Sequence, residues 1–187
     1  MKRIASVILT GALILSMGAA AFAATPSKTV ADEIKADVAV ETTGFDRVSI
    51  STEETEATVA QSAEVVKELA SSTEELKETA GATAEEKIEI IAVRTVTSKQ
   101  TPLFNRTKVT VSLSSAVIDA ACTENEQVTV LVMVPVVGKD GTVTYEKIAV
   151  TGVVKDGKVQ VKLTGALLKK IGKRNVTLVA IKKIAKV

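Results

Sequence analysis

The sequence has 187 residues, with 24 basic and 22 acidic side chains, one cysteine and no histidine or tryptophan. The lack of histidine excludes hydrolases of the usual Ser-His or Cys-His type and most zinc sites, because imidazole is the base or the ligand in those sites. A single cysteine cannot form an internal disulfide. Stability must therefore come from the burial of Val, Ile, Leu and Ala side chains.

Residues 1–23 have the pattern of a cleavable secretory signal peptide. After a short basic start, an apolar run extends from Ile4 to Phe22 and ends in the small-x-small pattern Ala21-Phe22-Ala23. A retained membrane helix is the alternative, but the run is rich in alanine and no basic stop-transfer signal follows it. We predict cleavage after Ala23 and export from a bacterial cell.

Cys122 bears on both anchoring and packing. A lipoprotein needs a cysteine directly after the cleavage site, and Cys122 lies far beyond it. The C-terminus has no apolar tail, so we expect a secreted, extracellular protein without a transmembrane anchor after cleavage, held at the cell surface by non-covalent contacts if at all. Cys122 follows apolar residues on a predicted short helix, which favours core packing over pairing between chains.

Charge divides the chain into two parts. Residues 25–86 carry 15 acidic and 5 basic side chains, whereas residues 87–187 carry 7 acidic and 17 basic ones. We predict an acidic, partly disordered arm over 24–84 and a basic, β-rich domain over 85–187. The arm contains a predicted helix near 55–80, whose thin apolar stripe docks weakly on the same chain or on a partner. The opposite charges allow the arm to fold back on the basic domain or to pair between chains.

Strand patterns dominate the basic part. Lys87–Thr97 is dense in β-branched residues, and Lys108–Leu113 alternates apolar and polar residues. Val128–Val137 is almost continuously apolar, which is typical of a central strand covered on both faces. Asp140-Gly141 and Asp156-Gly157 are hairpin turn signals, because glycine accepts the positive backbone torsion of such turns.

An internal repeat relates residues 108–134 to residues 158–182. Lys108–Leu113 matches Lys158–Leu163, and each strand leads into a short amphipathic helix and a returning strand. Ser114 and Thr164 are the predicted helix N-caps. Two short helices from a duplicated strand–helix–strand unit predict an α+β fold, with a β-sandwich as the alternative.

Catalysis is disfavoured by the remaining side chains. The acids of the second half fall at exposed strand positions, helix ends and turns, and aromatic platforms for sugar binding are few. Asp140 and Asp156 each stand alone beside lysines, which argues against calcium binding. We therefore expect no enzymatic activity, no cofactor and no metal.

The basic residues near the C-terminus are the candidate binding site. They could contact an anionic polymer, such as a cell-wall polymer, or acidic headgroups; the alternative is an ordinary solvated surface with cations suited to a helix C-terminus. Nucleic acid is disfavoured by export and by the lack of stacking aromatics. The candidate residues are Lys169, Lys170, Lys173, Arg174, Lys182 and Lys183.

The function that these patterns favour is that of an exported, non-enzymatic binding or structural module. Its partner would be a cell-wall polymer or another secreted protein. The alternative is a secreted inhibitor or accessory subunit of an extracellular enzyme. No oligomeric state follows from the sequence.

Overall fold

Strands make up most of the structure, a computed structural model that describes residues 13–15, 34–43, 48–100, 102 and 107–185. Most of the predicted signal peptide lies outside the described residues. The strands are β1 (Leu13–Leu15), β2 (Asp37–Thr43), β3 (Ile50–Ser51), β4 (Glu86–Ser98), β5 (Lys108–Ser114), β6 (Gln127–Val137), β7 (Val143–Lys155), β8 (Lys158–Thr164) and β9 (Asn175–Ala185). The helices are α2 (Glu56–Ser71), α3 (Thr73–Thr79), α4 (Ala116–Ala121) and α5 (Gly165–Ile171).

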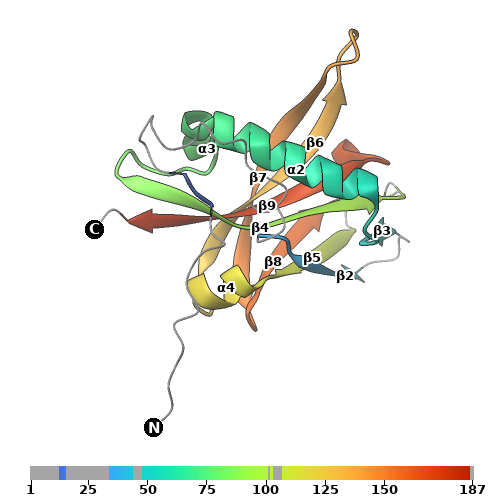
Figure 1. The fold of residues 1–187 in the computed structure, drawn as a ribbon. Helices are drawn as coiled ribbons and strands as arrows, with labels where there is room; N and C mark the ends of the chain where they lie inside the picture. The colour runs from blue at the N-terminus through green and yellow to red at the C-terminus, as the bar shows by residue number, and fades with distance from the viewer. Residues whose placement is uncertain (1–12, 16–33, 44–47, 101, 103–106, 186–187) are drawn as a thin grey trace.

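The described strands form one sheet in the order β1-β4-β9-β6-β7-β8-β5-β2, and β3 pairs with β4. Its strand pairs are antiparallel. The residues before β2, at one end of this order, also bond to β4, which lies next to its other end: the Ala36 N–H donates to the Val93 carbonyl at 3.0 Å and the Val93 N–H donates to the Ile34 carbonyl at 2.8 Å. The sheet therefore curls into a near-barrel (Figure 1).

This arrangement corrects the predicted fold class. The β-rich second half with two short helices is present, but the chain is mainly β and does not have the balance of an α+β fold. The β-sandwich alternative is wrong as well, since the described strands belong to a single sheet and not to two packed sheets.

Two apolar cores lie on opposite faces of β6, β9 and β4. Inside the near-barrel, Val130 and Val132 of β6 pack with residues from β5, β8 and β9. On the outer face, Leu131 and Met133 pack beneath α2 and α3, with Leu69 of α2 among their neighbours. The prediction that Val128–Val137 is covered on both faces is thus confirmed for its central part, where successive residues are buried.

The predicted helix over 55–80 forms as two helices. Thr55 caps α2 by accepting from the Thr58 N–H at 3.2 Å. The backbone leaves the helical region at Ser72, with φ −124° and ψ 48°, so the prediction of one helix was wrong at this point. Both helices lie on the sheet (Figure 1). The predicted boundary near residue 84 stays a prediction.

Charge contributes to this docking. The Lys147 ammonium of β7 lies 3.5 Å from Glu68 of α2 and 2.9 Å from Glu75 of α3. Because the Lys147 side chain is only 11% exposed, its two partners also compensate for the partial loss of hydration. Of the alternatives for the acidic region, its described part thus folds back on the basic part of the same chain.

The two predicted strand–helix–strand units are both present as β5–α4–β6 and β8–α5–β9. Val111 of β5 pairs with Val161 of β8, and Leu131 of β6 pairs with Val179 of β9. Each pair joins equivalent positions of the two units, as a local two-fold relation would require. Duplication as the origin of these units stays a prediction.

Their helix caps agree with the prediction in one unit only. Thr164 caps α5, accepting from the Leu167 N–H at 3.3 Å. The cap of α4 is Ser115 and not Ser114, and its hydroxyl oxygen accepts from the Ile118 N–H at 3.1 Å. Ser114 is still part of β5, where it pairs with Asp37, so the helix starts one residue later than predicted.

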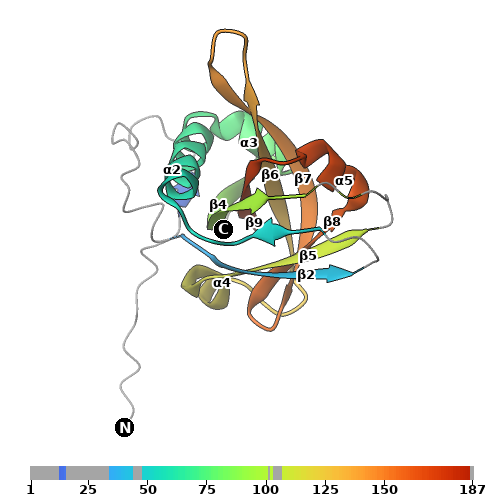
Figure 2. The ribbon, with the colours of Figure 1, turned by 90° about the vertical axis from the view of Figure 1, so that its right-hand side faces the viewer.

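Both predicted hairpins form, with different turns. Asp156 and Gly157, with φ 50° and 68°, make the two-residue turn between β7 and β8 that needs positive φ at both positions. The β6–β7 turn is longer and is closed by the Gly138 N–H donating to the Thr142 carbonyl at 2.8 Å. This hairpin extends beyond the body of the near-barrel, as Figure 2 shows.

Candidate functional site

The structure separates the six predicted basic residues into two groups. Lys169, Lys170, Lys173 and Arg174 are exposed around the end of α5 and the start of β9. Lys170 is paired with Glu146 at 2.5 Å, an exposed contact of low energetic value. Lys173 and Arg174 carry the charge that faces the neighbouring hairpin.

Lys182 and Lys183 lie near the far end of β9, roughly 26–30 Å from Arg174 at the usual rise of a strand. The Lys182 ammonium lies 2.9 Å from Glu126 and donates to the Ala121 carbonyl, and its side chain is 19% exposed. Lys183 donates to the Gly81 carbonyl at 3.3 Å. The structure therefore does not bring these two lysines together with the other four.

The surroundings of Lys182 shift the pKa values of nearby groups. Burial opposes ionisation of Glu126, but the bonds from Lys182 and Thr123 outweigh it and lower the pKa of its carboxyl. Burial raises the pKa of the Glu89 carboxyl and of the Cys122 thiol. Cys122 is half-buried and packs against the inner core, in line with the packing interpretation. The contacts of Lys182 connect β9 to the end of α4 and to the residue before β6.

Lys173 and Arg174 line an open groove of about 730 Å³ beside the protruding hairpin. This volume lies within the range of ligand pockets. Exposed apolar side chains gather at the hairpin, where Val136 is 41% exposed, Val137 68% and Val143 49%. The residues that line the groove are Gln61, Thr97, Pro135, Val136, Val137, Lys173, Arg174 and Asn175.

The groove exists because β6 and β9 separate. β6 pairs with β7 as far as Val137, but its pairing with β9 ends at Met133. Pro135 has no N–H to continue the ladder, and its carbonyl instead accepts from the Arg174 guanidinium at 3.4 Å. The divergence leaves the last residues of β6 beside the two cations.

Neutral hydrogen bonds hold the opposite wall. The Thr97 hydroxyl donates to the Asn175 side-chain oxygen at 2.8 Å. The Gln61 amide of α2 donates to the Asn175 carbonyl at 3.4 Å and to the Thr177 hydroxyl at 3.2 Å. These bonds fix the start of β9, which carries Lys173 and Arg174 just before it.

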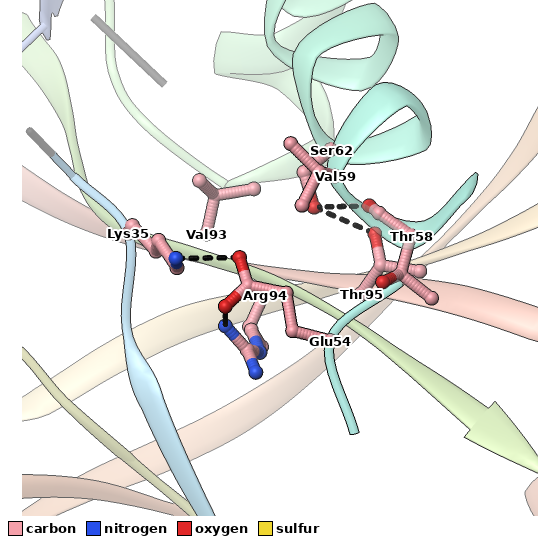
Figure 3. A pocket seen from close by; sticks show the side chains of 8 residues that line it. All are labelled: Lys35, Glu54, Thr58, Val59, Ser62, Val93, Arg94 and Thr95. Carbon is pink, nitrogen blue, oxygen red and sulfur yellow. Dashed lines mark hydrogen bonds and ion pairs between the residues drawn. The ribbon is translucent and has the colours of Figure 1, made fainter. Parts of the chain in front are cut away.

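A second pocket, between α2 and β4, is shown in Figure 3. Its volume is about 20 Å³, which suits roughly one water molecule. Glu54 lies 2.5 Å from Lys35 and 3.4 Å from Arg94, and the hydroxyls of Ser62 and Thr95 are 2.7 Å apart. Because the polar groups of this pocket bind one another, we interpret the pocket as a set of structural contacts that connect α2, β4 and the residues before β2.

Sequence reasoning found the two cations of the groove but missed its apolar and amide residues. Pro135 could have indicated the end of the β6–β9 pairing, since a proline within a strand sequence marks an edge strand or the end of a ladder. The contributions of Gln61 and Asn175 had no sequence signal, because they depend on how α2 crosses β9.

Among the described residues, no group of three or more acidic or cysteine side chains is placed to hold a metal ion. In the same part of the chain, no helix combines the length and apolarity needed to cross a membrane. Comparison with family models, with curated proteins and with solved structures finds no match to this chain.

Proposed function

We propose that the protein is an exported, non-enzymatic binding module that holds an anionic ligand in the groove. The observation that carries the proposal is the juxtaposition of Lys173 and Arg174 with exposed Val136 and Val137 in one groove. Single exposed apolar side chains are ordinary on a protein surface, so the proposal rests on the gathering of Val136 and Val137 beside two cations in one groove.

Charge gives the groove its preference for anions. Lys173 has no acidic partner among the described salt bridges, and the only bond of the Arg174 side chain there is to the neutral Pro135 carbonyl. A bound anion would therefore meet two cations whose charge is not already neutralised. Such an interaction weakens as salt is added, because counterions screen exposed charges.

The apolar side chains restrict the kind of ligand. Covering the exposed parts of Val136 and Val137 stabilises a complex only if the ligand has apolar groups near its negative charge. The proposed ligand, which carries apolar groups as well as negative charge, is a cell-wall polymer or another secreted protein.

The test is binding of biotinylated inorganic polyphosphate, as a model polyanion, to the purified protein in a salt series. We expect the double variant Lys173→Ala/Arg174→Ala to bind at least about tenfold more weakly at low salt. The matched control is Lys155→Ala/Lys158→Ala, which removes the same charge from exposed residues at the distant β7–β8 turn. Equal weakening by both double variants would mean that only net charge matters and would refute a site in the groove.

A further inference from the structure

The last residues of β6 carry backbone groups that face the groove. The Gly138 N–H donates to the Thr142 carbonyl, and the register places Val137 opposite Val143. In an antiparallel ladder, hydrogen-bonded and non-hydrogen-bonded pairs alternate. The pair Val137–Val143 is therefore of the second kind, and the Val137 N–H and carbonyl point away from β7, toward the side of β9.

Nothing in the described part of the chain pairs with Val137 on that side. The ladder between β6 and β9 stops at Met133, and the next outward carbonyl, that of Pro135, accepts from Arg174. Val137 thus presents one donor and one acceptor at an open strand edge. Such an edge is a template for another extended chain.

On these grounds, and resting on the proposed function, we propose that the ligand is an acidic, extended segment of a partner protein that adds to β6 as a further strand. Its backbone would pair with the Val137 N–H and carbonyl. An apolar side chain of the segment opposite Val137 would cover that residue, and a carboxylate two residues along, opposite Pro135 and on the same face of the sheet, would meet Arg174 and Lys173.

A polypeptide fits the groove better than a phosphate polymer. The Val137 edge offers a donor and an acceptor together, which is the complement of a peptide unit in a strand. A phosphate polymer has only acceptors near neutral pH, so it would leave the Val137 carbonyl without a partner. It would also leave the valine side chains in contact with water.

The hairpin offers a matched pair of variants. Val137→Pro removes the edge N–H without removing a hydrogen bond to β7, because that N–H points away from β7. Val143→Pro does the same on the opposite edge of the hairpin, where β7 pairs with β8 only from Gly152 onward. Proline is tolerated at edge positions whose N–H is not used in the ladder.

The probe is a short capped peptide that alternates threonine with valine and glutamate, titrated against the purified protein by fluorescence anisotropy. We expect Val137→Pro to weaken binding at least about tenfold and Val143→Pro to leave it unchanged. The same peptide with N-methylated valine and glutamate amides should not bind the unaltered protein, which tests the backbone pairing without any change to the fold.

Each contrary result has its own meaning. Undiminished binding by Val137→Pro, or by the N-methylated peptide, would overturn strand addition. If the peptide fails while polyphosphate binds through Lys173 and Arg174, this inference is wrong and the proposed function stands; if neither binds, both are wrong. Self-association in light scattering that Val137→Pro abolishes would assign the edge to a second copy of the chain and would likewise overturn the inference.

Discussion

The Arg174 guanidinium donates to the Pro135 carbonyl at 3.4 Å, at the point where β6 and β9 part. An arginine side chain here takes the place that a backbone N–H would have in a continued ladder. Arg174 therefore bonds to β6 at the end of the β6–β9 pairing and also lines the groove. This double position means that its contribution to binding has to be separated from its contribution to folding.

Arg174→Ala is expected to weaken polyanion binding while changing the free energy of unfolding by no more than about 0.5 kcal/mol, as is usual for exposed positions. Urea denaturation followed by circular dichroism measures the stability, and anisotropy measures the binding. A loss of stability of several kcal/mol would show that Arg174 is chiefly a structural residue.

Leu69→Ala should destabilise the protein by about 2–5 kcal/mol, the usual cost of removing a fully buried leucine side chain. Leu69 is 0% exposed between α2 and the outer face of the sheet. Urea denaturation gives the difference, and Lys67→Ala, at an exposed position of the same helix, is the control. A small effect would mean that α2 does not dock as described.

Gly152→Ala should destabilise by about 1–3 kcal/mol through overpacking of the inner core. A methyl group at this position would lie 2.8 Å from Val159 and 2.9 Å from Val130 side-chain carbons. Thermal denaturation measures the loss. In the double variant Gly152→Ala/Val159→Ala the two effects should not add, because the second change removes one of the clashing groups; strict additivity would contradict the described packing.

Glu126→Gln should lower stability at neutral pH by on the order of 1 kcal/mol, through loss of the charged bond to Lys182. The pKa of Glu126 is lowered in the folded protein, so its contribution is present above the unfolded value of about 4.3 and is lost as the pH falls through the folded value. Urea midpoints of the two proteins should therefore converge in acid. A difference that stays constant down to strongly acidic pH would rule out this ion pair as its cause.

The sequence predicted the strands of the second half well because their patterns are local, whereas β1, β2 and β3 lie in segments for which no strand was predicted. Lys87–Thr97 appears as β4 within a residue at each end, and the turn at Asp156-Gly157 follows from two positions that need positive φ. The closure of the sheet was not predictable in this way. It depends on Ile34–Ala36 meeting Val93, a contact between segments that show no mutual signal in the sequence.

The site was predictable only in part for the same reason. A run of basic residues gives charge, but the sequence does not say that β9 carries Lys182 away from Arg174 and into a bond with Glu126. The open edge at Val137 follows from the register of three strands together with one proline. Such features arise from the pairing of strands that are far apart in the sequence, and local sequence patterns do not show which strands pair.

The most direct test of a binding groove is an NMR titration of the isotopically labelled protein with polyphosphate, followed through backbone amide shifts. If the ligand binds in the groove, the largest changes in amide chemical shift occur at Gln61, Val137, Arg174 and Asn175, and the amide shifts of the β7–β8 turn change little. Changes spread evenly over the exposed lysines, or centred on Lys155 and Lys158, would contradict it.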